Sequence, residues 1–535
     1  MSKTNGGRAT DFDAVIVGAG FAGMYMLHRL RGLGLSARVF ETGDGVGGTW
    51  YWNRYPGARC DVESMEYSYQ FDDALQQEWN WSERYSPQPE ILEYANHVAD
   101  RFDLRRDIQF ETRVTSTVFD EAADCWTVET DRGDKVTAAY VVMATGCLSS
   151  TNTPDFPGLE RFQGPHYHTG NWPQEGVDFT GKTVGVIGTG SSAIQSIPII
   201  AEQAKHLTVF QRTPNYAVPA HNGPLDPAVR DSVKANYATF RAEAKEMRSG
   251  LHTRPNEQSA LAVSEEERRA EFEKRWQAGG LPFMGAFMDL LLDENANKTA
   301  AEFVREKIRA VVHNPAVAEL LSPKTIIGCK RLCVDTGYFQ TYNRPNVTLV
   351  DVSETPVEAI TANGVVVAGT EYQLDAIVFA TGFDAMTGAL AKIDIRGVDG
   401  QALKEKWAAG PRSYLGLASA GFPNLFTITG PGSPSVLSNM LPSIEQHVEW
   451  IADCIGYLRA HGLKRIDPTV AAEDAWVGHV NDVANHTLYP SCNSWYLGAN
   501  VPGKPRVFMP YIGFPPYVEK CKDVVAKGYE GFALA

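Results

Sequence analysis

The sequence has little positive charge, few cysteines and no long apolar run, and each shortage excludes a class of protein. Among its 535 residues, 49 Lys and Arg are outnumbered by 64 Asp and Glu, which gives a formal net charge of −15. A chain this acidic is a poor general binder of nucleic acid or anionic membrane, so an anionic ligand needs a local basic pocket. No apolar run is long enough to cross a bilayer. We therefore expect neither a nucleic-acid nor a membrane partner, and the sequence implies no protein partner.

The eight cysteines are scattered along the chain, and none belongs to a CxxC pair. Cys329 and Cys333 are four residues apart, which permits a metal or redox pair, but reduced thiols are the ordinary state of such cysteines. The N-terminal residues 1–11 are polar and lack the apolar segment of a secretory signal. We therefore expect reduced cysteines, no bound metal and a cytoplasmic location.

Glycine, by contrast, is abundant, with 48 residues, and some of it follows predicted strands. Residues 13–41 have the pattern of a strand, a GxGxxG turn, a helix and a second strand, with the glycines at Gly18, Gly20 and Gly23. In such a unit the first glycine makes the tight turn, the second admits a pyrophosphate, and the third lets the helix pack on the strand. Glu41 ends the second strand, where an acid accepts hydrogen bonds from ribose hydroxyls. This segment predicts a site for the ADP half of FAD.

A second glycine-rich turn follows the predicted strand 183–187. It consists of Gly188, Thr189, Gly190, Ser191, Ser192 and Ala193. The position that holds an acid in the first unit is Gln211 here, and Arg212 and Thr213 follow it. A carboxylate would repel a 2′-phosphate, whereas this tripeptide supplies a cation and a hydroxyl donor. The second site is therefore predicted to prefer NADP(H) to NAD(H).

Two dinucleotide sites in one chain predict electron transfer between them and an α/β fold with two Rossmann-like domains. Two more apolar strands end in Ala-Thr-Gly at residues 144–146 and 380–382, and we interpret them as the crossings between the domains. The stretch between them includes a charged, alanine-rich region with helix-start signals, such as the capping box at Ser264. The predicted units are an FAD domain (1–148 and 384–535), an NADP domain (149–218 and 327–383) and a helical insertion (219–326).

Residues 162–173 read FQGPHYHTGNWP, which resembles the FxGxxxHxxxWP fingerprint of type I Baeyer–Villiger monooxygenases. A second signature of this family is present in Gly47-Gly48-Thr49-Trp50, Tyr55-Pro56-Gly57 and Asp61. The resemblance extends from residue 13 to residue 532. It is greatest to the phenylacetone and steroid monooxygenase branch, and cyclohexanone monooxygenase is more distant.

The resemblance implies an NADPH- and O₂-dependent flavoenzyme that inserts one oxygen into a small-molecule ketone to give an ester or lactone. In the family, NADPH reduces FAD, O₂ forms a C4a-peroxyflavin, and this peroxide attacks the ketone carbonyl. By match to the family, Arg331 holds the peroxide anion and stabilises the oxyanion, and Asp61 orients Arg331 and contacts the cofactors. Lys330 and Arg212 match the family's pair for the 2′-phosphate, with Thr213 beside them.

The resemblance implies further contacts. The remaining cofactor-binding positions are Ala22, Gly48, Thr49, Trp50, Arg59, Tyr67, Val114, Gln195, Met440 and Trp495. Residues 435–437 resemble a loop that shapes the ketone pocket, and His168 is expected to be structural rather than a catalytic base. Pro515 and Pro516 depart from the family pattern and leave the shape of a C-terminal, cofactor-facing loop open.

Three other functions share part of this pattern. An N-hydroxylating or S-oxygenating flavin monooxygenase has both turns, but should lack the Asp61–Arg331 pair and the full fingerprint. A flavin-dependent disulfide reductase needs a redox cysteine pair next to the flavin. A nucleotide sensor that has lost its chemistry has no need of Asp61, Lys330 and Arg331. The sequence therefore favours a Baeyer–Villiger monooxygenase, and it leaves the preferred ketone open.

Overall fold

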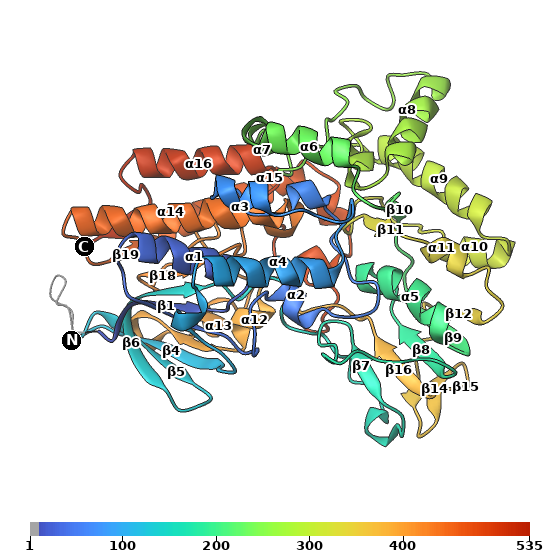
Figure 1. Ribbon diagram of the computed structural model, residues 1–535, viewed down its shortest axis with the longest axis horizontal. Coiled ribbons are helices and arrows are strands. Elements are labelled where there is room, and N and C mark those ends of the chain that lie inside the picture. The colour runs from blue at the N-terminus through green and yellow to red at the C-terminus, as the bar shows by residue number, and fades with distance from the viewer. Residues whose placement is uncertain (1–9, 505) are drawn as a thin grey trace.

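The structure is a computed structural model that describes residues 10–504 and 506–535. Most of the polar N-terminal segment, and with it the start of the predicted FAD domain, lies outside the described residues. Two sheets with helices packed on them lie side by side, and a block of helices stands beyond the second sheet (Figure 1). This is the α/β architecture with two Rossmann-like units that the sequence predicts. Within the described chain, every helix is too short or too polar to cross a bilayer.

The first sheet contains eight strands of the described chain, in the order β17-β4-β5-β6-β1-β2-β3, with β18 beside β6. The strands are β1 (Phe12–Val17), β2 (Ala37–Phe40), β3 (Ile108–Gln109), β4 (Val114–Asp120), β5 (Cys125–Thr130), β6 (Lys135–Met143), β17 (Asp394–Arg396) and β18 (Leu425–Thr427). Strand β1 runs parallel to β2 on one side and to β6 on the other. The turn after β1 therefore lies at the carboxyl edge of the sheet, where open α/β sheets bind ligands.

The second sheet is parallel throughout and has the order β12-β9-β8-β16-β7. Its strands are β7 (His166–His168), β8 (Thr183–Ile187), β9 (His206–Gln211), β12 (Val347–Asp351) and β16 (Ala376–Phe379). A small antiparallel sheet of β13 (Ala359–Ile360), β14 (Gly364–Val367) and β15 (Thr370–Gln373) follows. Because β17 and β18 return to the first sheet after this unit, the topology supports a split FAD domain. The exact domain boundaries stay a prediction.

Helices cover both sheets. The first sheet carries α1 (Phe21–Gly32), α2 (Thr49–Trp52), α3 (Asp73–Glu78), α4 (Gln88–Arg101), α12 (Gly388–Ala391), α13 (Leu403–Lys406), α14 (Met440–Ala460), α15 (Val470–Asn485) and α16 (Phe514–Ala526). The second carries α5 (Ser191–Gln203) and α11 (Tyr338–Thr341). The long helix α14 packs on both α1 and α16 (Figure 1). A last pair of strands, β19 (Ile466–Pro468) and β20 (Phe532–Leu534), lies near the C-terminus.

The region 219–326 is helical. Its helices are α6 (Pro227–Ala235), α7 (Tyr237–Lys245), α8 (Glu265–Ala278), α9 (Glu294–Val311) and α10 (Pro315–Leu321). The predicted capping box is present, since Ser264 and Glu267 exchange both of its hydrogen bonds. Strands β10 (Ala217–Pro219) and β11 (Cys333–Asp335) pair in parallel and bring the two ends of the region together. Phe272, Phe283, Phe287 and Phe303 share one hydrophobic cluster with the second sheet, whereas Tyr237 on α7 belongs to the cluster of the first sheet, so the region packs on both units.

The two prolines that depart from the family pattern lie at the start of a helix. Helix α16 begins at Phe514, so Pro515 and Pro516 occupy its first turn, where backbone N–H groups have no acceptor within the helix. The Phe514 N–H donates to the carbonyl of Arg248. The hydroxyl of Tyr517, one residue further on, lies 2.7 Å from Nε2 of buried His447. The prolines therefore start a helix that is anchored in the core.

Two glycines of the GxGxxG turn, Gly18 and Gly23, are in close contact, and this contact gives the first prediction. A Cβ atom on Gly23 would lie 1.8 Å from the carbonyl oxygen of Gly18, which is backbone and cannot rotate away. We expect Gly23→Ala to destabilise the protein by at least ~2 kcal/mol, at the upper part of the range for overpacked sites. Thermal unfolding and the FAD content of the purified protein measure this effect.

Gly32, at the end of the same helix, is the matched control, because a Cβ atom there would meet nothing within 4 Å. Gly32→Ala should leave the FAD content unchanged and stabilise the helix by up to about 1 kcal/mol. Equal melting temperatures for the two variants would contradict the proposed packing.

Candidate active site

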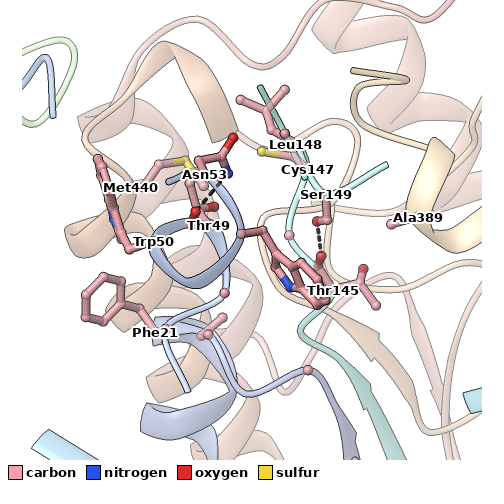
Figure 2. A pocket seen from close by; sticks show the side chains of 18 of the residues that line it. Phe21, Thr49, Trp50, Asn53, Thr145, Cys147, Leu148, Ser149, Ala389 and Met440 are labelled. Atoms are coloured by element: carbon pink, nitrogen blue, oxygen red, sulfur yellow. Dashed lines mark hydrogen bonds between the residues drawn. The ribbon is translucent and has the colours of Figure 1, made fainter. Parts of the chain in front are cut away.

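A cavity of about 760 Å³ lies along the carboxyl edge of the first sheet and reaches the second unit. Sixteen predicted site residues line it: Gly18, Gly20, Ala22, Glu41, Gly48, Thr49, Trp50, Arg59, Asp61, Tyr67, Val114, Ser191, Gln195, Arg331, Met440 and Trp495. Figure 2 shows Phe21, Trp50 and Met440 on one side of this cavity, with Cys147 and Leu148 on the other. Two glycine-rich turns and a partly buried cation thus meet around one space.

The first glycine-rich turn makes a narrow backbone cradle. A Cβ atom on Gly48 would lie 2.9 Å from Cα of Gly20, so only glycines allow the two segments to approach. Glu41 is buried and accepts hydrogen bonds from the N–H groups of Ala19 (2.7 Å) and Gly43 (2.8 Å). Burial raises the pKa of this carboxyl group. Glu41 therefore shapes the turn itself, and its bond to a ribose stays a prediction.

This cradle fits the ADP half of FAD, because the helix α1 begins at its end and directs free N–H groups to the site of a pyrophosphate. Behind it, the indole N–H of Trp50 donates to the hydroxyl of Tyr67 at 3.0 Å. The two rings are packed edge to face. The pair forms a rigid aromatic wall in the part of the cavity where Met440 also lies.

The second turn is built in the same way at the start of α5. Gly188 has φ +112°, and a Cβ atom there would lie 2.4 Å from the carbonyl oxygen of Ala380. The hydroxyl of Thr189 donates to the carbonyl of Thr213 at 2.9 Å, and the hydroxyl groups of Ser192 and Thr169 lie 3.0 Å apart. These contacts hold the turn against the loop that follows β9 and against the end of β7. Gly190 and Ala193 belong to the same turn and helix start.

Arg212 and Lys330 lie close enough to influence each other. Burial lowers the pKa of Lys330, and the charge of Arg212 lowers it further. Two like charges that are brought together favour binding of an anion between them. Gln211, in contrast, is buried and donates through its side-chain amide to the carbonyl of Leu320. The pocket at the end of β9 is thus cationic, as a 2′-phosphate requires.

Arg331 and Asp61, 270 residues apart in sequence, form a two-pronged ion pair. Nε of Arg331 donates to Oδ2 of Asp61 at 2.5 Å, and Nη2 donates to Oδ1 at 2.9 Å. The remaining Nη1 donates to the carbonyl of Val436 at 2.8 Å. Burial opposes the charged form of Arg331, but the charge and hydrogen bonds of Asp61 raise its pKa above the usual value. The cavity therefore contains a fixed, permanent cation.

Gln195 connects the two units. Its side-chain oxygen accepts from the Tyr55 hydroxyl (2.8 Å) and the Arg59 N–H (3.3 Å), and its amide donates to the Arg59 carbonyl at 3.1 Å. A Cβ atom on Gly57 would lie 2.3 Å from the backbone oxygen of Gln195. Through these contacts, helix α5 of the second unit holds the segment that leads to Asp61 in place. Gln195 lines the cavity, but its observed bonds are to protein.

His168 lies where the two crossings meet. Its Nδ1 accepts from the N–H of Gly170 at 3.0 Å, and its Nε2 lies 3.3 Å from the Thr381 hydroxyl. Burial lowers the pKa of His168, which keeps the imidazole neutral. These contacts agree with a structural role for this residue of the fingerprint.

Several residues that line the cavity were not predicted, including Asn53, Thr145, Cys147, Ser149 and Lys392. Figure 2 shows Ser149 directed at the backbone of Thr145, and Asn53 bonded to the backbone of Thr49. The Ala-Thr-Gly turn after β6 was interpreted only as a crossing. Because that turn ends a strand next to β1, its position in the sheet was the signal that pointed to the cavity.

The expectation of reduced cysteines is wrong at one pair. Cys329 and Cys492 form a disulfide, with Cα atoms 5.8 Å apart and 163 residues between them in sequence. Cys333 is not part of it and lies with its sulfur 3.3 Å from the hydroxyl of Ser191. Sequence spacing drew attention to Cys333, whereas the fold brings the distant Cys492 to Cys329.

Comparison with known proteins identifies the family. A family model described as pyridine nucleotide-disulphide oxidoreductase matches residues 15–271. The chain is 46% identical to a Baeyer–Villiger monooxygenase of Pseudooceanicola batsensis, over 97% of this chain and 95% of that protein. It is 44% identical to a phenazine N-monooxygenase of Lysobacter antibioticus, over 98% of this chain and 97% of that protein.

A solved structure extends this likeness to the fold. The structure of an oxidised steroid monooxygenase bound to NADP superposes with a TM-score of 0.94 and 59% identity, covering 98% of this chain and 99% of that chain. The two glycine cradles, the cationic pocket and the buried arginine lie within the matched region. The chain belongs to the type I Baeyer–Villiger monooxygenases, flavoproteins that use FAD and NADPH.

Proposed function

We propose that this monooxygenase acts on a small ketone, with O₂ as oxidant, and that Arg331 and Asp61 are the residues that adapt the cavity to this reaction. The observation that carries the proposal is the two-pronged Asp61–Arg331 pair between the two dinucleotide cradles. Bound FAD, reduced by NADPH, supplies the electrons that activate O₂. The protein contributes to the reaction by positioning the reactants and by placing charged side chains next to them.

Arg331 is suited to stabilise negative charge that develops on a ketone oxygen. A guanidinium keeps its proton throughout the physiological pH range, and Asp61 strengthens this further. Three of its N–H groups are held by Asp61 and Val436, so the cation does not need to reorganise when the substrate binds. The Val436 bond also connects Arg331 to the loop that we expect to shape the ketone pocket.

The walls of the cavity favour an apolar substrate. Trp50, Val436, Met440 and Ile444 line it, and only 5% of the surface of Val436 is exposed to solvent. An apolar enclosure excludes water, which strengthens the electrostatic effect of Arg331 and limits side reactions with water. A ketone with a hydrocarbon body fits these walls better than a charged metabolite.

For the second cofactor, we propose that Arg212, Lys330 and Thr213 hold the 2′-phosphate of NADP(H). Arg212 and Lys330 are close enough for the charge of one to lower the pKa of the other, and the uncharged Gln211 ends β9. This supports the assignment, because NAD(H) has no phosphate to offer the two cations. The nicotinamide end would then extend past Ser191 to Trp495, which line the same cavity. The cytoplasmic location inferred from the composition stays a prediction.

Oxygenation of an aromatic nitrogen is the second candidate, because a phenazine N-monooxygenase is nearly as similar to this chain as the Baeyer–Villiger enzyme is. A panel of linear, aryl, cyclic and steroidal ketones, together with phenazines, separates the two. We expect ester or lactone formation, matched by NADPH consumption, with at least one ketone. N-oxide as the only product would favour the second candidate.

Replacement of Arg331 tests the proposed mechanism. We expect Arg331→Ala to lower the rate of ketone oxygenation by roughly 100- to 1,000-fold, the usual cost of removing one group that stabilises an oxyanion. Ester formation is measured by gas chromatography, and FAD content and flavin reduction by NADPH are measured alongside. Arg396→Ala removes an exposed arginine that is paired with Asp394 and should change neither rate. Ester formation by Arg331→Ala at the wild-type rate would overturn the proposal.

The cofactor preference depends on the cationic pocket. Arg212→Ala should raise KM for NADPH by roughly tenfold or more, since a charge-assisted bond to phosphate contributes about 1.5–3 kcal/mol. KM for NADH should change little, because NADH has no 2′-phosphate. Initial rates of coenzyme oxidation give both values.

Lys205→Ala is the matched control for this prediction. Lys205 is an exposed cation that precedes β9, whereas Arg212 follows the same strand, so the two lie at opposite ends of it. We expect the control to leave both KM values unchanged. An equal loss of NADPH and NADH affinity in Arg212→Ala would argue against a phosphate contact.

A further inference from the structure

The disulfide joins two segments that each contribute a residue to the cavity. Cys329 stands two residues before Arg331, and Cys492 stands three residues before Trp495. Arg331 and Trp495 both line the cavity, at the end where we place the nicotinamide. One covalent bond thus fixes the separation between the proposed catalytic cation and the aromatic side chain opposite the second cofactor.

The segment around Cys329 is anchored on the helical insertion. The buried side chain of Asn297, on α9, donates to the carbonyl of Ile327 at 2.9 Å and accepts from its N–H at 3.0 Å. Asn297 also donates to the carbonyl of Leu290. This side of the disulfide is therefore held rigidly by the unit that carries the second dinucleotide turn.

The segment around Cys492 belongs to the C-terminal part of the chain. It packs through Tyr489, Tyr496 and Leu497 into a small hydrophobic cluster that also contains Val436. The charge of Arg331 reaches both tyrosines and opposes the upward shift that burial gives to their pKa values. The disulfide is thus a covalent bridge between the C-terminal segment and the segment that leads to Arg331, which is itself anchored on the insertion.

We propose that the Cys329–Cys492 disulfide is a reducible positioning tether, which holds the Trp495 segment against the Arg331 loop and so closes the NADP end of the cavity. This inference rests on the proposed function for the role of Arg331. When the bond is reduced, the two segments lose their fixed separation, and NADP⁺ is retained less well. Cys329 and Cys492 are positioning residues and do not themselves touch the reacting atoms.

The redox step balances with a common cellular oxidant. The two thiols lose two protons and two electrons as the sulfur–sulfur bond forms, and hydrogen peroxide accepts them to become two molecules of water. A dithiol reverses the reaction by forming its own disulfide. Both cysteines are 5% exposed, but the neighbours of Cys492, Ser491 and Asn493, are exposed, so a small reagent can approach the bond.

The other cysteines near the cavity are free thiols. Burial raises the pKa values of the thiols of Cys60, Cys147 and Cys333, which keeps them protonated. In a protein that we expect in the cytoplasm, a disulfide of this kind is typical of a regulatory bond rather than a permanent one.

The test compares oxidised and reduced holoenzyme. Alkylation followed by peptide mass spectrometry gives the fraction of Cys329–Cys492 disulfide after treatment with hydrogen peroxide or with a dithiol. In the reduced enzyme, we expect NADP⁺ to dissociate roughly 10- to 100-fold faster, the loss typical of a misplaced binding group. KM for NADPH should rise while flavin reduction at saturating NADPH stays the same, a split that a purely stabilising bond would not produce.

Variants make the result specific. The double variant Cys329→Ser/Cys492→Ser should behave like the reduced enzyme and should not respond to either reagent. Cys454→Ala, at a buried thiol in α14 away from the cavity, should respond as the wild type does. The NADP⁺ measurement needs no ketone, so it stands even if the proposed substrate class is wrong. The inference is overturned if the disulfide does not form under peroxide, or if only the melting temperature differs between the two states.

Discussion

The ion pair of Asp61 and Arg331 is the interaction around which the other parts of the site are arranged. A guanidinium that is largely removed from water is costly unless a carboxylate and further acceptors surround it, and here Asp61 and the Val436 carbonyl provide them. Each of these groups comes from a different part of the chain. Gln195 grips the segment before Asp61, Cys329 lies two residues before Arg331, and Val436 begins the loop that leads into α14. The position of one charge therefore depends on both dinucleotide units and on the C-terminal segment.

This dependence explains why the cavity lies where it does. The first glycine turn and the second are each self-contained, with close backbone contacts that a single methyl group would prevent. Between them, the two units meet through side chains such as Gln195 and His168, through the two crossings, and through a backbone hydrogen bond from the Trp172 N–H to the Trp52 carbonyl. A cation held across this junction is sensitive to the relative position of the units. The same junction brings the two cofactors of the family together.

The local motifs could be predicted because their physics is local. The close contact of Gly18 with Gly23, the capping box at Ser264 and the missing acid at Gln211 all depend on residues near each other in sequence. The Asp61–Arg331 pair was predicted only through resemblance, because no spacing rule connects residues 270 positions apart. The disulfide was missed for the same reason, and Cys147 was missed because it follows a turn that has no motif of its own. Sequence reasoning did not give the order of the strands in each sheet. That order decides which strand ends lie next to one another.

The split first sheet also constrains the order in which the protein can be built. Strand β6 pairs with β1 and β5, which are made early, and with β18, which is synthesised only after the whole second unit. When the second unit and its insertion have been synthesised, the first sheet still lacks β17 and β18. The first sheet is complete only when residues near 425 have been synthesised. The strand that completes the sheet of the first dinucleotide unit therefore follows the whole second unit in the chain.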